Sequence, residues 1–311
     1  MTVDINFVAP QLPTPPDGYD PQAFEQFNNV LRIYFNQLDN ALRDAMAVQE
    51  PYELQVSKGQ VVGASTEYKF GFNPDVDGTE ESIWGHGGNY PWATAAFTAF
   101  ISSSSTADTS AGTGAQTVTV EGLDENYASQ SVTVNMNGQT QVQIGDASGW
   151  LRVNRVFVAS SGSGGTAAGD IYVAVSGVSS GVPTGTAYAK VLAGDNQTQQ
   201  AIYTVPAGST FYADDVTFTA AISIANKNVT AKLVSRNFGS NTFRTRLIQT
   251  LQSDILIIPF NFPLTFPEKT DIECRASSDT TNVEVGASFQ GVLISIIRVL
   301  VVSPLPLNLH L

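Results

Sequence analysis

The chain has 311 residues, of which only 14% are charged, and its 28 acidic residues outnumber 15 Lys and Arg, giving a formal charge of −13. Nucleic-acid binding needs clustered Lys and Arg on the phosphates, so this balance predicts no nucleic-acid partner. The single cysteine, Cys274, excludes an intramolecular disulfide, and a chain of this length buries enough surface to fold without one. Cys274 lies in a run of alternating apolar residues and is predicted to be a buried small hydrophobe.

Residues 1–50 are predicted to form an extended arm followed by one amphipathic helix. Closely spaced prolines between residues 10 and 16 favour an extended backbone in the arm, whose apolar residues suit docking on a neighbour; a flexible terminus is the alternative. Asp20 and Pro21 supply an N-cap and a first-turn proline for a helix over residues 21–48, which ends before Pro51.

Apolar side chains of this helix recur at spacings of three and four residues, as in a coiled-coil seam. The spacing predicts oligomerisation through the helix, with a homotrimer as our choice and a dimer as a further possibility. A lone helix packed on the rest of the protein is the alternative. The predicted oligomerisation residues are Phe24, Phe27, Leu31, Tyr34 and Leu38.

An acidic, glycine-rich segment follows between residues 73 and 92. Asp75 and Asp77 are candidate oxygen ligands for a hard cation, but the glutamates follow too soon for a full calcium loop. We therefore favour an acidic turn and predict neither a metal nor a cofactor. Trp84, Tyr90 and Trp92 are candidate glycan-binding residues, because aromatic rings stack on sugars; alternatively, they plug one end of a β-sandwich.

The rest of the chain predicts a mainly β protein, with a first β region at residues 51–200 and a second at 201–294. A first strand is expected within residues 52–72, and others at 117–121, 131–136, 140–144, 151–158 and 171–175. The glycine-rich loop 160–170 lacks a following helix and the lysine of a phosphate-binding loop, so we expect a hairpin loop.

The second β region contains short runs in which apolar residues recur at every second position, which predicts half-buried strands of an antiparallel, jelly-roll-like sandwich. The two regions form either one interleaved sandwich or two packed ones. Pro259, Pro263 and Pro267 place their segment at a sheet edge or in a loop, because proline cannot sit in a central strand. Residues 295–311 are an apolar, proline-broken tail predicted to lie on the body or a neighbouring subunit.

No catalytic residues are predicted, and we expect no enzymatic activity. The two histidines, His86 and His310, belong to no recognisable nucleophile or zinc motif; an unrecognised glycan hydrolase is the alternative. The most apolar window, residues 292–302, is shorter than a membrane helix and contains Arg298, which predicts no membrane insertion. Without a visible secretory signal, synthesis in a cytoplasm is expected.

Several segments resemble a family of virion structural proteins from marine tailed bacteriophages. In the second β region these are "AIYTVPAG…FYADDV", "FRTRLIQTLQ", "FPLTFPEKTDIECRAS" and "VGASFQGVLI". Upstream they are "IWGHGGNY", "SSSSTADTSAGTGAQTVTVEGLDENY" and "WLRVNRVFVASSGSGGTAAGDI", and the phrase "LRIYFNQLDN" resembles the leader of such proteins. The resemblance implies a location in the virion and does not distinguish between the head, the connector and a tail fibre.

Together these features predict a virion structural protein on the particle exterior, most simply a capsid decoration or head-fibre protein. Its expected partners are itself and the major capsid or other virion proteins. The alternative is a tail-fibre, adaptor or receptor-binding protein that recognises host surface glycans, followed by a stand-alone glycan-binding sandwich.

Overall fold

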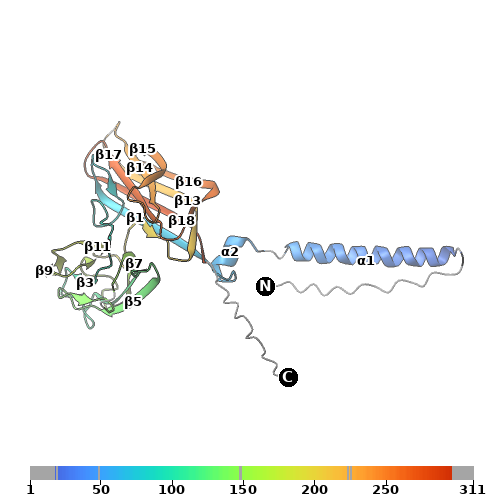
Figure 1. Ribbon diagram of the computed structural model, residues 1–311, viewed down its shortest axis with the longest axis horizontal. Helices are drawn as coiled ribbons and strands as arrows, with labels where there is room; N and C mark the ends of the chain where they lie inside the picture. Colours follow the sequence, from blue (N-terminus) through green and yellow to red (C-terminus); the bar gives the residue numbers. More distant parts are fainter. Residues whose placement is uncertain are drawn as a thin grey trace, which may run out of the picture. The chain divides into compact units, whose positions relative to one another are not determined.

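The computed structural model describes residue 18 and residues 20–47, 50–146, 149–222, 224 and 226–295 (Figure 1). The chain divides into two compact units, Met1–Val62 and Gly63–Leu311. Most of the predicted N-terminal arm, and the predicted C-terminal tail beyond Ser295, lie outside the described residues.

In the first unit, helix α1 spans Pro21–Ala47, within a residue of the predicted helix. Asp20 caps it as expected. Its Oδ1 accepts a hydrogen bond from the Gln22 amide at 2.9 Å, and its carbonyl oxygen accepts one from the Phe24 amide at 3.2 Å. A side chain that accepts an orphan amide of the first turn is what an N-cap supplies.

A second helix, α2 (Tyr52–Ser57), occupies the start of segment 52–72, where a linker and a first strand were predicted. The carbonyl oxygen of Pro51 accepts hydrogen bonds from the amides of Leu54 and Gln55 at 3.0 and 3.1 Å. Leucine, glutamine and glutamate are good helix formers, and this local preference favours a helix here. The first strand therefore begins only at Ala64.

The second unit contains an antiparallel β-sandwich of two sheets. Strands of the first sheet lie in the order β1 (Ala64–Val76), β18 (Val283–Ser295), β13 (Ser209–Ala221) and β16 (Ile255–Phe266). Those of the second lie in the order β12 (Ile202–Thr204), β17 (Asp271–Ser278), β14 (Val229–Arg236) and β15 (Arg244–Leu251), with β2 (Glu81–Ser82) also on β17. The predicted mainly β, antiparallel fold class is confirmed.

The sandwich strands are wound as nested pairs. The first strand, β1, pairs with the last, β18, and the inner pairs are β12 with β17, β13 with β16 and β14 with β15. Successive pairs alternate between the two sheets, so the chain behaves as one long hairpin folded over itself. Bonds from β13 to β18 and from β14 to β17 complete each sheet.

Period-two alternation builds the core of the sandwich, as predicted. Phe211, Val216 and Phe218 point inward from β13 and are fully buried. From the facing sheet, Leu233 and Cys274 pack into the same cluster, also fully buried. Burial raises the pKa of the Cys274 thiol, with the neighbouring Glu273 charge acting in the same direction. Cys274 is thus the buried hydrophobe that the sequence predicts.

Strand β16 is the edge of its sheet and carries two of the three prolines, Pro259 and Pro263, which confirms their predicted placement. Proline has no amide hydrogen to give to a further strand, so it fits only where one side of the strand is unpaired. The strand has no charged residue, and its Ile255, Ile257 and Phe262 side chains are 59%, 62% and 87% exposed.

Between β2 and β12 the chain leaves the sandwich and forms a second body, the inserted body, which adjoins it (Figure 1). Its two main sheets share one apolar core. Strands of the first sheet lie in the order β11 (Ala187–Val191), β8 (Ile171–Ala174), β3 (Phe100–Ser103) and β6 (Val142–Gln143). Those of the second lie in the order β5 (Ser129–Asn135), β4 (Ala115–Leu123) and β7 (Arg152–Ser161). A small hairpin pairs β9 (Val178–Ser179) with β10 (Val182–Pro183).

Strand pairing does not follow the predicted boundary at residue 200. Strand β1, expected in the first β region, completes the sandwich of the second region by pairing with β18 along most of its length. Alternation in the sequence predicts a strand but does not predict which strand pairs with it. Here the partner of β1 lies over 200 residues away in the sequence. The second unit thus consists of two bodies, the sandwich and the body inserted into its sequence.

The loop 160–170 is not the expected hairpin, because β7 and β8 belong to different sheets. It folds over Asp108, which is fully buried. The Asp108 carboxylate accepts hydrogen bonds from the amides of Ala115, Ala168 and Gly169 at 2.7, 2.8 and 2.9 Å. A buried carboxylate requires such donors, so Asp108 organises this loop.

Candidate functional site at the junction of the two bodies

The aromatic loop predicted to bind glycans lies at the junction of the sandwich and the inserted body. Trp84 and Tyr90 are 2% and 5% exposed and pack on Ile202 of the sandwich. Tyr90 meets Trp84 and Trp92 edge to face, with ring centroids 5.1 and 4.9 Å apart, and Tyr188 of the inserted body packs on the same cluster. Burial raises the pKa of the Tyr90 phenol. These contacts fit the alternative of an aromatic plug, which fills the junction and not one end of the sandwich.

A sugar needs an open ring face on which to stack. Trp84 and Tyr90 offer none, and Trp92 is half-buried, with its Nε1 donating a hydrogen bond to Glu273 Oε2 at 2.8 Å. His86 covers one face of Trp84, with the rings 5.0 Å apart at 23°. The geometry gives these three aromatic residues a packing role.

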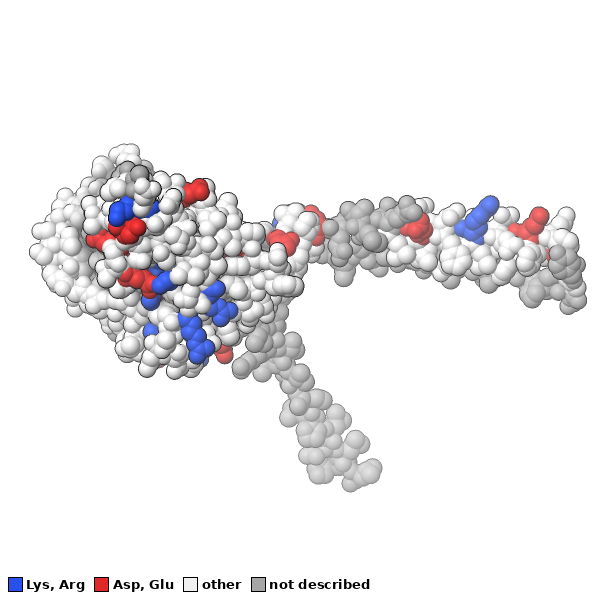
Figure 2. Space-filling view, turned by 90° about the horizontal axis from the view of Figure 1, so that it is seen from above, with Lys and Arg blue, Asp and Glu red and all other residues white. Residues whose placement is uncertain are grey.

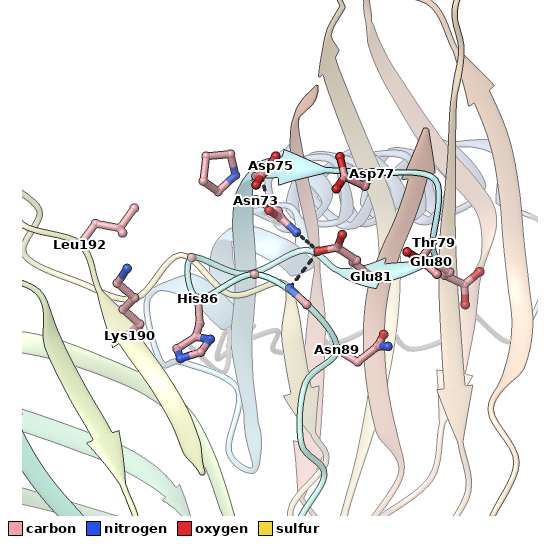
Figure 3. A pocket seen from close by; sticks show the side chains of 14 residues that line it. Asn73, Asp75, Asp77, Thr79, Glu80, Glu81, His86, Asn89, Lys190 and Leu192 are labelled. Carbon is pink, nitrogen blue, oxygen red and sulfur yellow. Dashed lines mark hydrogen bonds between the residues drawn. The ribbon is translucent and has the colours of Figure 1, made fainter. Parts of the chain in front are cut away.

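The acidic segment lines a pocket of about 640 Å³ beside this loop (Figure 3). Most of its carboxylates already have partners. Glu81 Oε2 accepts hydrogen bonds from the amide of Gly88 at 2.8 Å and from Asn73 Nδ2 at 3.2 Å. Glu80 pairs with Lys232 and, at 3.3 Å, with Arg275. Burial opposes ionisation of Glu80, but the hydrogen bonds from these two cations outweigh it and lower its pKa.

Asp75 and Asp77, the candidate cation ligands, line the same pocket but point from different places along its wall (Figure 3). Asp77 Oδ1 accepts a hydrogen bond from the Asn282 amide at 3.2 Å. Among the residues that the structure describes, no group of three or more His, Cys, Asp or Glu side chains comes together as a metal site. Asp75 lies near the end of β1 and Asp77 directly follows that strand.

A buried ionic network holds the inserted body against the sandwich. Arg152, on β7, forms a bidentate pair with Asp271, on β17, at 2.9 and 3.1 Å, and both side chains are about 5% exposed. Arg236 and the Thr204 hydroxyl contact the same carboxylate, each at 2.6 Å. Bidentate guanidinium–carboxylate pairs fix geometry in two directions, so this pair sets the orientation of the two bodies.

Glu273, two residues along β17, is the second anchor of the network and is 1% exposed. It contacts Arg275 at 3.0 Å, Trp92 Nε1 and the Ser82 hydroxyl. Strand β17 is thus buried on both faces: the apolar face packs in the sandwich, and the charged face holds the junction. The sequence "DIECRAS" carries this signal, because charged residues alternate with apolar ones, although the strand prediction used only the apolar half.

Helix α1 carries the predicted oligomerisation residues. Phe27, Leu31, Tyr34 and Leu38 form a half-buried stripe, and Phe24 is 57% exposed. Further large apolar side chains lie beside the stripe, with Ile33, Phe35 and Leu42 between 48% and 59% exposed. Charges on the helix are few and of both signs (Figure 2). Neither described helix is long and apolar enough to cross a membrane.

Comparisons with known proteins identify no family for this chain. No protein-family model matches the chain, and no curated protein matches it. Among solved structures it is similar to that of infectious bursal disease virus Gt strain, with 8% identity and a TM-score of 0.19 over 75% of this chain and 73% of that one. It is also similar to the VP2 subviral particle of the same virus, with 10% identity and a TM-score of 0.20 over 75% and 72%. TM-scores of this size do not define a shared fold.

Proposed function

We propose that this chain is a structural protein of a virus particle, with a non-enzymatic role. The observation that carries the proposal is the winding of the sandwich. We infer that the nested pairs β1–β18, β12–β17, β13–β16 and β14–β15, distributed over two sheets, form a jelly roll. Jelly rolls recur in viral capsid and lectin domains. Fold alone leaves several functions open, so further features of this chain must support the choice.

The sequence supports the virion class independently of the winding. Segments from both bodies and from α1 resemble virion structural proteins of marine tailed bacteriophages. In the structure these segments fall on elements of every part: "VGASFQGVLI" on β18, "WLRVNRVFVASS" on β7 and "LRIYFNQLDN" on α1. The resemblance therefore extends over the sandwich, the inserted body and the helix.

Assembly is the role that we assign to α1. Exposed phenylalanine and isoleucine side chains on one helix are unfavourable in water and gain free energy when another apolar surface covers them. The seam of Phe27, Leu31, Tyr34 and Leu38 suits a second and third copy of the same helix, and we propose a homotrimer. The uncharged, apolar edge strand β16 offers a second contact surface for neighbours in a particle.

We further propose a place on the outside of the particle, as a capsid decoration or head-fibre protein. The formal charge of −13 disfavours contact with packaged nucleic acid. Acidic and basic side chains are interspersed on the face of the body shown in Figure 2, which has no broad basic patch. The alternative is a tail-fibre, adaptor or receptor-binding protein of the same virion class, with host surface glycans as its ligand.

Electron microscopy of intact particles, labelled with gold-bound antibody fragments against the inserted body, tests the proposal. Label over the head surface is the expected result. Label confined to the tail would favour the alternative position, and absence of the protein from purified particles would refute the virion role. An antibody against an unrelated internal protein of the same particles is the control for leakage.

A further inference from the structure

A polar cleft opens on another side of the junction, between β1 of the sandwich and β4 and β7 of the inserted body. It has a volume of about 520 Å³ and continues into a hollow of about 330 Å³. Both volumes fall within the range of about 300–1,000 Å³ that is usual for small-molecule sites. The residues common to both hollows are Glu67, Lys69, Glu121 and Asn154.

The register of β1 explains why charged groups line this cleft. Lys69 pairs with Phe289, whose ring lies in the sandwich core, and paired residues of antiparallel strands share a face. Glu67, two residues earlier, lies on the same face of the strand. Both side chains thus enter the space between the two sheets at the edge where the inserted body contributes Asn154 and Glu121.

Lys69 is 8% exposed, which is unusual for a lysine. Its Nζ lies 3.6 Å from Glu67 Oε2 and 4.9 Å from the centroid of the Tyr203 ring, which it covers. Burial lowers the pKa of Lys69, and the Arg155 charge adds to this effect, while Glu67 opposes it. Because the pKa stays lowered, Glu67 and Glu121 compensate for the burial of this ammonium only in part.

Two buried polar atoms in the floor have no hydrogen-bond partner within the described chain. Gln200 is 3% exposed; its Nε2 donates to the Val153 carbonyl at 2.8 Å, but its Oε1 has no partner. The hydroxyl of Tyr203, which is 2% exposed, also has none. Such atoms are rare in folded proteins and cost about 1–3 kcal/mol each. Gln200 lines the larger hollow and Tyr203 the smaller one, so a ligand in the cleft lies beside both residues.

The chemistry of the lining defines the class of ligand. Two carboxylates, Glu67 and Glu121, balance two cations, Lys69 and Arg155, so the cleft favours an uncharged molecule. Gln200 Oε1 needs a donor, the Tyr203 hydroxyl can donate or accept, and the charged groups supply both kinds of partner. Sugar hydroxyl groups donate and accept at once and satisfy all of these groups.

We propose that this cleft binds a neutral oligosaccharide, with Glu121 and Arg155 at its mouth and Gln200 and Tyr203 in its floor. The site lies away from the aromatic loop that the sequence suggested for glycans. This inference goes beyond the proposed virion role, because binding in the cleft requires neither the helix nor a particle.

The test is binding of the full chain to an array of neutral and carboxylated oligosaccharides, followed by calorimetry with the neutral sugar that binds best. Glu121→Gln and Arg155→Gln should each weaken that affinity by at least about tenfold, as expected for a lost hydrogen bond to a charged group. Glu284→Gln and Arg244→Gln make the same changes on exposed residues outside the cleft and should leave the affinity unchanged.

A specificity readout separates binding from a structural role. Glu121→Gln removes one of two carboxylates, so the ratio of affinities should shift from neutral toward carboxylated sugars. Unchanged affinity and unchanged ratio in both cleft variants, or no binding of any neutral oligosaccharide, would overturn the proposal. Leu31→Asp should keep the sugar affinity even where it abolishes assembly, so failure of the assembly role and failure of the glycan site can be told apart.

Discussion

Helix α1 and the sandwich use the same apolar residue types in opposite ways. The phenylalanines Phe211, Phe218 and Phe289 are at most 1% exposed inside the sandwich, whereas Phe24 and Phe35 of the helix are 57% and 59% exposed. The sandwich thus completes its core within one chain. The helix leaves large apolar side chains exposed, and under the proposed assembly its stability should depend on the protein concentration.

The largest effect is expected inside the sandwich. Phe289→Ala removes a ring that packs against Phe211, with centroids 6.2 Å apart, and should lower the free energy of unfolding by about 3–5 kcal/mol. Urea denaturation of the full chain measures it. Phe262→Ala, at an 87% exposed position on β16, is the control and should stay within about 0.5 kcal/mol. Equal losses for both would mean that the core has been placed wrongly.

A somewhat smaller loss is expected at the junction. Arg152→Ala takes the bidentate partner from Asp271, but Arg236 and Thr204 still contact that carboxylate. The cost should therefore be about 2–3 kcal/mol, below the 3–5 kcal/mol of a completely broken buried pair. Denaturation followed by two probes, one in each body, should also show that their unfolding transitions separate. Arg155→Ala, an exposed neighbour on β7, should change neither the stability nor the cooperativity.

The smallest effect concerns pH. Partial burial lowers the pKa of His86 from its ordinary value of 6.5, and the Lys190 charge acts in the same direction. The unfolded chain therefore binds a proton at His86 more readily than the folded chain does. The free energy of unfolding should be largest above pH 6.5 and should fall slightly as the pH drops toward 5. His86→Gln should flatten this dependence, measured by thermal unfolding across pH 5–7.5. His310→Gln is the control, and an identical slope in both variants would contradict this account.

Sequence reasoning recovered the local features that depend on nearby residues. Asp20 and Pro21 begin α1, alternation around Val216, Leu233 and Cys274 builds the core, and the prolines of β16 mark an edge. Each of these depends on periodicity or on backbone chemistry within a few positions.

Features that depend on distant partners were not recovered. Nothing near β1 indicates that it pairs with β18, and nothing near Lys69 indicates that the inserted body closes over it. The burial of Trp84 and Tyr90 likewise depends on Ile202 and Tyr188, more than 90 residues further along the chain. The sequence shows that these side chains are aromatic, but only the tertiary structure determines whether they are exposed to solvent.

Sedimentation velocity across a hundredfold concentration range is the sharpest test of the proposed assembly through α1. The unmodified chain should form a trimer, and Leu31→Asp should remain a monomer with an unchanged free energy of unfolding of the sandwich. Asn36→Asp adds the same charge at an exposed polar position of the helix and should still form a trimer. A Leu31→Asp chain that associates as tightly as the unmodified one would contradict the account and direct attention to β16 as the assembly surface.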